Sequence, residues 1–151
     1  MIIQSGFDFQ VLARPYILPN GVLLPRLVVV GLDSDMCFRS AGIASFQFDG
    51  WQEPLIDDIL EVLPADGTRY FAIAYPGFWR THNFESAQPS AADVESLRER
   101  AGERGLYLLG HFGIGEEHEM QVNLESYFDQ SEMVVPRTML HWRHSVLPNC
   151  P

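Results

Sequence analysis

The residues best suited to chemistry lie between positions 77 and 93, in the stretch GFWRTHNFESAQPSAAD. His82 and Asp93 are of the types that zinc hydrolases use as ligands, and Ser90 is able to orient a ligand or hold an intermediate. Such an enzyme takes three protein ligands, leaves the fourth position to water and adds a carboxylate that moves the proton. No third ligand is evident, and Arg80 stands where a second histidine is expected. The stretch therefore has the form of a metal site with members missing.

The same residues also fit structural roles that need no metal. Ser90 to Asp93 has the form of a helix N-cap box, with the acid near the positive end of the helix dipole. His82 alone fits a loop histidine. His111 lies on an apolar segment and fits a core histidine with a hydrogen-bond partner. Both interpretations stay open at Ser90, because one serine can cap a helix and border a site.

Other groups with ligand chemistry have weaker context. Residues 116–119 read EEHE between strand-like segments and are expected to form a solvated turn. His141 and His144 have a helical spacing but no third ligand, so we expect packing or exposure of the tail. Tyr75, Phe78 and Trp79 either line a groove or pack in the core, and the apolar neighbours favour the core.

The chain around the stretch alternates between strand-like and helix-like periods. Phe7, Phe9 and Val11 alternate with polar neighbours and predict an opening strand, after which a hairpin follows. Counted from that hairpin, the order is β-β-α-β-α-β-β-β, which predicts an α+β fold with a mixed β-sheet and flanking helices. The predicted elements cover residues 23–33, 36–48, 53–64, 69–79, 91–104, 106–112, 120–128 and 132–140. The candidate site would then lie at a strand end that leads into a helix, a common place for binding.

Side-chain spacing within these elements predicts the buried faces. In the second strand of the hairpin, four apolar residues are expected on one face, and each helix has one apolar side. Glu95 and Arg98 are spaced for a surface ion pair, and Gly105 is a stop for the second helix. The expected inward residues are Phe38, Ala44, Phe46 and Phe48 in the strand, Leu55, Ile56, Ile59, Leu60 and Leu63 in the first helix, and Val94, Leu97 and Ala101 in the second.

Composition sets the broad class. The 151 residues, 46% hydrophobic, predict a single domain over residues 1–151. A net charge of -10, with arginines spread along the chain and no lysine, predicts no nucleic-acid partner. No apolar run is long enough to span a membrane, and nothing resembles a signal peptide. Cys37 and Cys150 do not form a disulfide framework, so we expect a reducing, cytoplasmic location.

The stretch resembles the JAMM metalloprotease motif of the JAB/MPN superfamily, in which H-x-H-P at a strand end precedes S-x-x-D at a helix start. Without gaps, the two histidines of the family fall on Arg80 and His82, its proline on Asn83, its serine on Ser90 and its aspartate on Asp93. The resemblance implies a JAB/MPN-like fold, which is related to the cytidine-deaminase-like architecture.

The resemblance covers about residues 24–125 and is closest to the bacterial RadC-like branch. The blocks LVVVGLDSD, PLIDDILEVL and PSAADVESLRERAGERGLYLLGHFGIG have counterparts there in the same order, and His111 falls on a histidine that this branch also carries. Two departures affect function. The glutamate that acts as base in the family should fall near Pro25 or Arg26, and Arg80 replaces a zinc ligand, although a guanidinium offers no lone pair. The metal motif is therefore degenerate.

These observations lead to three hypotheses. The first is a non-catalytic JAB/MPN-like domain, a pseudoenzyme that binds a protein partner of the JAB/MPN type or a peptide, with no cofactor and with Arg80 supplying positive charge to Asp93. The second is a zinc-dependent peptidase or isopeptidase that uses His82, Asp93 and His111 as ligands, with Glu85 or a turn glutamate as base. The third is a DNA-related accessory function by analogy with the RadC-like branch, against which the net charge argues. We favour the first.

Overall fold

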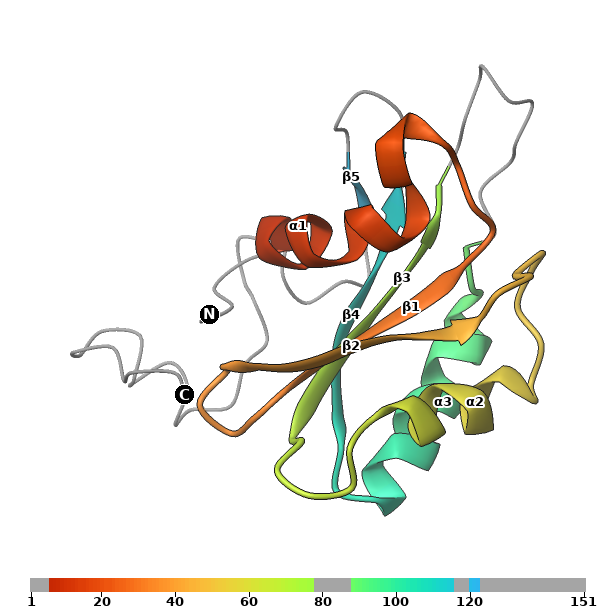
Figure 1. Ribbon diagram of the computed structural model, residues 1–151. Helices are drawn as coiled ribbons and strands as arrows, with labels where there is room; N and C mark the ends of the chain where they lie inside the picture. The colour runs from red at the N-terminus through yellow and green to blue at the C-terminus, as the bar shows by residue number, and fades with distance from the viewer. Residues whose placement is uncertain (1–5, 78–87, 116–119, 123–151) are drawn as a thin grey trace.

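A five-stranded mixed sheet with helices on both faces forms the centre of this protein, in the computed structural model of Figure 1. The structure describes residues 6–77, 88–115 and 120–122. The strand order is β2-β1-β3-β4-β5; β3 and β4 are parallel, and the other neighbouring pairs are antiparallel. The elements in chain order are α1 (Gly6–Ile17), the 3-10 helix η1 (Pro19–Gly21), β1 (Leu27–Leu32), β2 (Phe38–Ser45), α2 (Leu55–Val62), β3 (Tyr70–Pro76), α3 (Ala91–Glu103), β4 (Tyr107–Ile114) and β5 (Met120–Val122).

The sheet separates two apolar layers. Helix α1 covers one face, where Phe9 stacks on Phe112 with ring centroids 5.5 Å apart. Helices α2 and α3 cover the other face, where Ile59 and Leu97 are fully buried. All residues of β1 and β3 are buried, as expected for strands that are covered on both sides. The sheet thus supplies a rigid support for residues on β3, β4 and α3.

The prediction of an opening strand is wrong, because residues 6–17 form helix α1. The buried residues Phe9, Ala13 and Ile17 recur every four positions, which is the helical period, whereas Val11 is 48% exposed. Phe9 belongs both to this helical row of buried residues and to the short alternation of Phe7, Phe9 and Val11. The alternation alone therefore has the pattern of a strand. The helix also continues through Pro15 instead of ending before it.

The hairpin is confirmed, but its faces differ from the expectation. β1 pairs with β2 in an antiparallel register that shifts near each end, so that Arg39 and Ala44 are extra residues on β2. Each bulge turns the following side chain to the other face. As a result Phe38 packs on the α1 side and Ala44 on the α2 side, while Phe46 is 64% exposed.

The central elements are confirmed. α2 buries Ile56, Ile59 and Leu60, and Leu63 follows them into the same cluster. The expected inward residues of α3, Val94, Leu97 and Ala101, are also buried. The Glu95 to Arg98 ion pair forms at 3.0 Å. Gly105 follows the helix with a φ of 75°, a left-handed conformation that glycine adopts without a steric penalty. The last two predicted strands are described only at residues 120–122, where β5 forms.

Cys37 lies buried at the turn of the hairpin and is disulfide-bonded, contrary to the expectation of reduced cysteines. Cys150, the other cysteine in the sequence, lies outside the described residues. Among the helices that are described, none has the length and apolar character needed to cross a membrane.

Candidate functional site

The structure describes three of the five predicted site residues. Ser90 and Asp93 lie at the start of α3, and His111 lies in β4 beneath that helix. Arg80 and His82 fall outside the described residues. So do Glu85, the turn at 116–119, both tail histidines, Phe78 and Trp79. The pairing of Arg80 with Asp93 therefore stays a prediction.

Ser90 and Asp93 form a reciprocal capping box. The Ser90 Oγ accepts a hydrogen bond from the Asp93 amide at 3.1 Å, and the Asp93 Oδ2 accepts one from the Ser90 amide at 3.0 Å. Two of the amides that no helical carbonyl can reach are thereby satisfied, and the carboxylate lies at the positive end of the helix dipole. The structural role predicted for these residues is confirmed, and the Oδ1 of Asp93 is not used in it.

His111 is buried against Tyr75 on the α3 side of the sheet. The two rings lie 5.9 Å apart at an interplanar angle of 29°, and the Tyr75 hydroxyl is 2.9 Å from the Nδ1 of His111. The Phe48 ring also packs near Tyr75, with ring centroids 6.4 Å apart. The parallel pairing of β3 with β4 brings the histidine and the tyrosine together although they are far apart in the sequence.

Burial keeps both rings in their neutral forms. Removal of water, together with the positive charge of Arg98 on α3, lowers the pKa of His111 to about 4. Burial also raises the pKa of the Tyr75 hydroxyl well above its usual range. At neutral pH the pair therefore consists of an uncharged imidazole and an uncharged phenol.

One nitrogen of this pair has no partner. Within the described part of the chain, the Nε2 of His111 is buried without a hydrogen bond. If the Tyr75 hydroxyl donates to Nδ1, the proton on Nε2 is left unpartnered; if Nδ1 donates, the phenol proton needs another acceptor. Either tautomer leaves a buried polar group whose desolvation costs about 1–3 kcal/mol. His111 is thus a core histidine, as predicted, but among the described residues only one of its nitrogens has a partner.

Ser90, Asp93 and His111, the predicted site residues that the structure describes, do not form a metal-binding group. In the segments 6–77, 88–115 and 120–122, no three His, Cys, Asp or Glu side chains converge in a way that could hold a metal ion. Within these segments, no hydrogen bond or ion pair joins Asp93 to His111. What the described residues provide is a hydrogen-bonded pair of Tyr75 and His111 under α3, in which the Nε2 of His111 is not used, and a reciprocal cap at the start of the helix.

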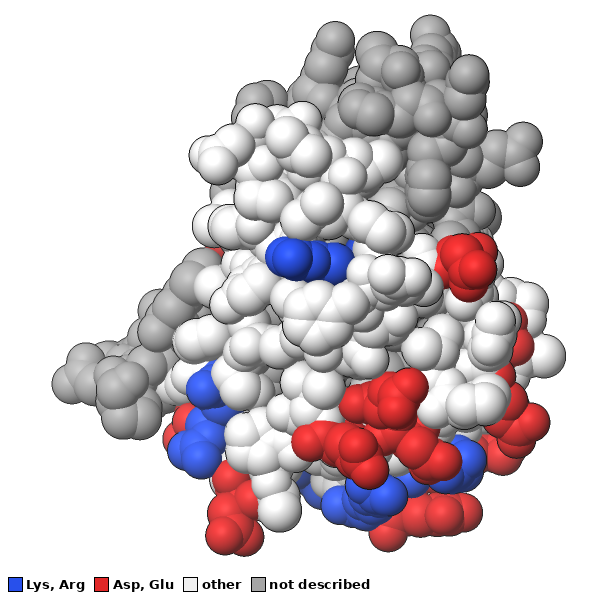
Figure 2. Space-filling view, turned by 45° about the vertical axis from the view of Figure 1, so that its right-hand side comes forward, with Lys and Arg blue, Asp and Glu red and all other residues white. Residues whose placement is uncertain are grey.

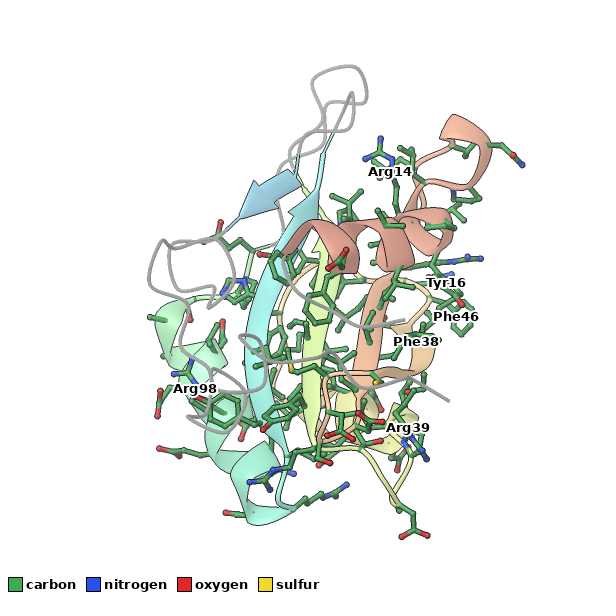
Figure 3. The ribbon with its side chains drawn as sticks, turned by 90° about the vertical axis from the view of Figure 1, so that its left-hand side faces the viewer. Arg14, Tyr16, Phe38, Arg39, Phe46 and Arg98 are labelled. Atoms are coloured by element: carbon green, nitrogen blue, oxygen red, sulfur yellow. The ribbon has the colours of Figure 1, made fainter. Side chains whose placement is uncertain are left out.

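A second group of residues, at the edge of the sheet, was missed from the sequence. The Arg26 guanidinium lies over the Phe46 ring, 5.5 Å from its centroid, and its Nη1 donates to the Tyr16 carbonyl at 3.2 Å. Figure 3 shows Tyr16, Phe38, Phe46 and Arg39 all on the side of the molecule that carries β2. This arrangement depends on the bulges of β2, and a single sequence carries no clear signal for a bulge.

Charge is also unevenly distributed. Acidic residues of α2, among them Asp57, Asp58 and Glu61, are exposed, and Figure 2 shows acidic side chains gathered with arginines in the lower part of its view. Above them lies a broad surface that is largely uncharged. On this face, the charged side chains of the described residues are therefore gathered in one part of the surface.

Searches with this chain found no matching protein-family model, no matching curated protein and no matching solved structure.

Proposed function

We propose that this protein is a non-catalytic domain of JAB/MPN-like fold that serves as a binding or assembly module for another protein. The proposal takes the resemblance from the sequence and the chemistry from the described residues. From β1 to β4, the elements follow one another in the order of the blocks that carry the resemblance, within an α+β fold with a mixed sheet. This order is compatible with the proposed fold.

The observation that carries the proposal is the capping box at the start of α3. The Ser90 hydroxyl and one Asp93 oxygen are engaged by backbone amides at 3.1 and 3.0 Å. These contacts stabilise the helix whether or not a metal is bound. The retention of serine and aspartate in this motif therefore has a structural reason that is independent of catalysis.

The position expected for the catalytic base gives a second argument. Pro25 has no ionisable side chain, and the Arg26 guanidinium is engaged with the Tyr16 carbonyl and the Phe46 ring. A guanidinium stays protonated at neutral pH and accepts no proton from water. Loss of a general base typically lowers a rate by roughly 10²–10⁴. Residues 25 and 26 therefore argue against the reaction that the resemblance implies.

One observation favours the second candidate, a zinc-dependent peptidase. His111 is neutral at pH 7, and its Nε2 lone pair or proton has no partner among the described residues. A neutral imidazole with an available nitrogen is the form that binds zinc. In that case His82, Asp93 and His111 would be the ligands, and a nearby glutamate would be the base.

Metal content separates the two candidates. The protein would be purified without added metal, incubated with a slight excess of Zn²⁺, desalted and analysed by mass spectrometry of the elements. We expect no stoichiometric zinc and no hydrolysis of fluorogenic peptide or isopeptide substrates. About one equivalent of zinc, lost in His82→Ala and Asp93→Ala and retained in the surface control Asp58→Ala, would establish the zinc site instead.

The exchange of a metal for an arginine has its own test. If Arg80 supplies positive charge to Asp93, Arg80→Ala should lower the melting temperature, because a partly buried carboxylate would lose its partner. Asp93→Asn in the same background should then recover part of the loss. An unchanged melting temperature in Arg80→Ala would contradict the exchange, whatever the zinc content is.

A further inference from the structure

Among the described residues, the outer edge of β2 has no neighbouring strand. β2 is the terminal strand of the sheet and pairs with β1 on one side only. Within the described residues, no backbone hydrogen bond reaches its other side. An edge strand presents a row of unpaired amides and carbonyls on which another strand can form.

The usual protections of an edge are weak here. Proteins block edges with charged side chains, prolines or bulges. β2 has no proline, its one charged residue is Arg39 near the start, and its two bulges lie near its ends. Ser40 to Ile43, between the bulges, keeps regular pairing and consists of small or apolar residues. None of these protections therefore occurs at residues 40–43 of the described edge.

Apolar side chains lie next to this edge. On the α1 side, Tyr16, Phe38 and Ala41 are only partly buried against the core. Phe46, directly after β2, is 64% exposed, and Figure 3 shows the three aromatic residues on this side of the molecule. An added strand would place alternate side chains on this surface, as the two-residue period of a strand requires.

Two arginines, one near each end of β2, give this edge positive charge. Arg26 lies over Phe46 and Arg39 donates to the Asp66 carbonyl at 3.1 Å, so backbone carbonyls hold both guanidiniums in place. The ion pairs of the described residues involve Arg98 and Arg100, and neither Arg26 nor Arg39 pairs with a carboxylate there. In a chain with 20 acidic and 10 basic residues, two arginines without acidic partners at one edge indicate an acidic ligand.

We propose that the outer edge of β2 docks an extended acidic segment of a partner protein, which adds as a sixth strand and places carboxylates near Arg26 and Arg39. This deepens the proposed binding role and rests on it only for the existence of a partner. The distance along β2 between the ends at which Arg39 and Arg26 lie corresponds to about 20 Å at roughly 3.3 Å per residue. The segment therefore has acidic residues about six positions apart, with apolar residues alternating between them.

A synthetic peptide tests the edge directly. The probe is acetyl-Glu-Val-Thr-Val-Thr-Val-Glu-amide, titrated into the full chain labelled with ¹⁵N. We expect amide shifts concentrated at residues 38–46. Two N-methylated forms, each blocking alternate amides, should differ in binding, because only one set of amides faces β2. Equal binding of both forms, or no shifts at millimolar peptide, would overturn the proposal.

Charge exchange tests the role of the arginines. Arg39→Glu and the pair Arg26→Glu/Arg39→Glu should bind the peptide roughly tenfold more weakly or worse, and should gain affinity for the version with lysine at both ends. Arg104→Glu, an exposed change at the end of α3, is the matched control and should bind like the parent. If the double variant does not fold, Arg39→Glu alone decides the outcome. Equal affinity of the parent for both peptides would contradict the proposal.

The oligomeric state tests a different occupant. If the parent forms a dimer at rising concentration and the amides of β2 become protected from exchange, a second copy occupies the edge and the proposal fails. The metal measurement is independent of all these results. The two sets of measurements together would therefore identify a zinc peptidase whose β2 edge binds peptide, and equally a metal-free domain whose β2 edge does not.

Discussion

The two sides of this sheet use their polar groups in opposite ways. Under α3, where the sequence motif points, the groups face one another: Ser90 with Asp93, and Tyr75 with His111. At the β2 edge, which no motif marks, no backbone hydrogen bond from the described residues reaches the outer side of the strand, and Phe46 is 64% exposed. The difference teaches that residues of a motif can stabilise a fold through local contacts, whereas exposed groups at another part of the sheet leave no motif in the sequence.

Among the variants that test this contrast, Tyr75→Ala should have the largest effect on stability. Tyr75 is fully buried and its ring packs near those of Phe48 and His111, so truncation should cost about 3–5 kcal/mol of the free energy of unfolding. Urea denaturation followed by circular dichroism measures the loss. Tyr75→Phe removes only the hydrogen bond to His111 and should cost about 1 kcal/mol. A loss below about 1 kcal/mol in Tyr75→Ala would show that this region is not a packed core.

The charge state of His111 gives the next effect. Its pKa is about 4 in the folded protein and close to 6.5 when unfolded, so the unfolded chain binds the proton first as the pH falls. Above pH 6.5 the titration of His111 does not lower the free energy of unfolding. As the pH falls from 6.5 to 4, this titration should lower the free energy of unfolding by about 3 kcal/mol. The difference between the stability profiles of the parent and His111→Phe isolates this effect from the titration of carboxylates. A constant difference from pH 4 to 7 would contradict a neutral buried imidazole.

The capping box predicts a smaller loss. Ser90→Ala removes the acceptor of the Asp93 amide and should cost about 1 kcal/mol, whereas Ser90→Thr keeps an acceptor and should cost less. Thermal denaturation of the three proteins measures the difference. If Ser90→Ala is as stable as the parent, the serine is retained for another reason, and the zinc site becomes the better explanation of the motif.

The exposed edge gives the smallest effect on stability. Phe46 is 64% exposed, so Phe46→Ala should change the free energy of unfolding by less than about 0.5 kcal/mol. The same variant should weaken binding of the acidic peptide, because it removes both an apolar contact and the support of the Arg26 guanidinium. A large loss of stability would place Phe46 in the core and would break the contrast between the two regions.

The central elements were predictable because one physical pattern dominates in each. β1 and β3 are continuous apolar runs, and α2 and α3 have clear helical stripes with a proline, a serine cap or a glycine at their ends. α1 was misread because a short alternation and the start of a four-residue stripe share Phe9. A prediction made only within a short window cannot separate these two periods.

The candidate site was predictable only in part. The cap at Ser90 is encoded locally, since its partner is three residues away. The contact of Tyr75 with His111 depends on the parallel register of β3 and β4, which the sequence does not reveal. The faces of Phe38 and Ala44 depend on bulges for the same reason.

The strand order has a consequence for how the chain folds. The β1–β2 hairpin joins segments that are near in sequence, whereas the β3–β4 pairing must wait until the intervening loop and α3 close a long stretch of chain. Closing longer loops costs more conformational entropy, and parallel pairs form slowly. We therefore expect amides of the hairpin to become protected before those of β4 in pulse-labelled hydrogen exchange during refolding. Simultaneous protection would instead indicate that the whole sheet condenses in one step.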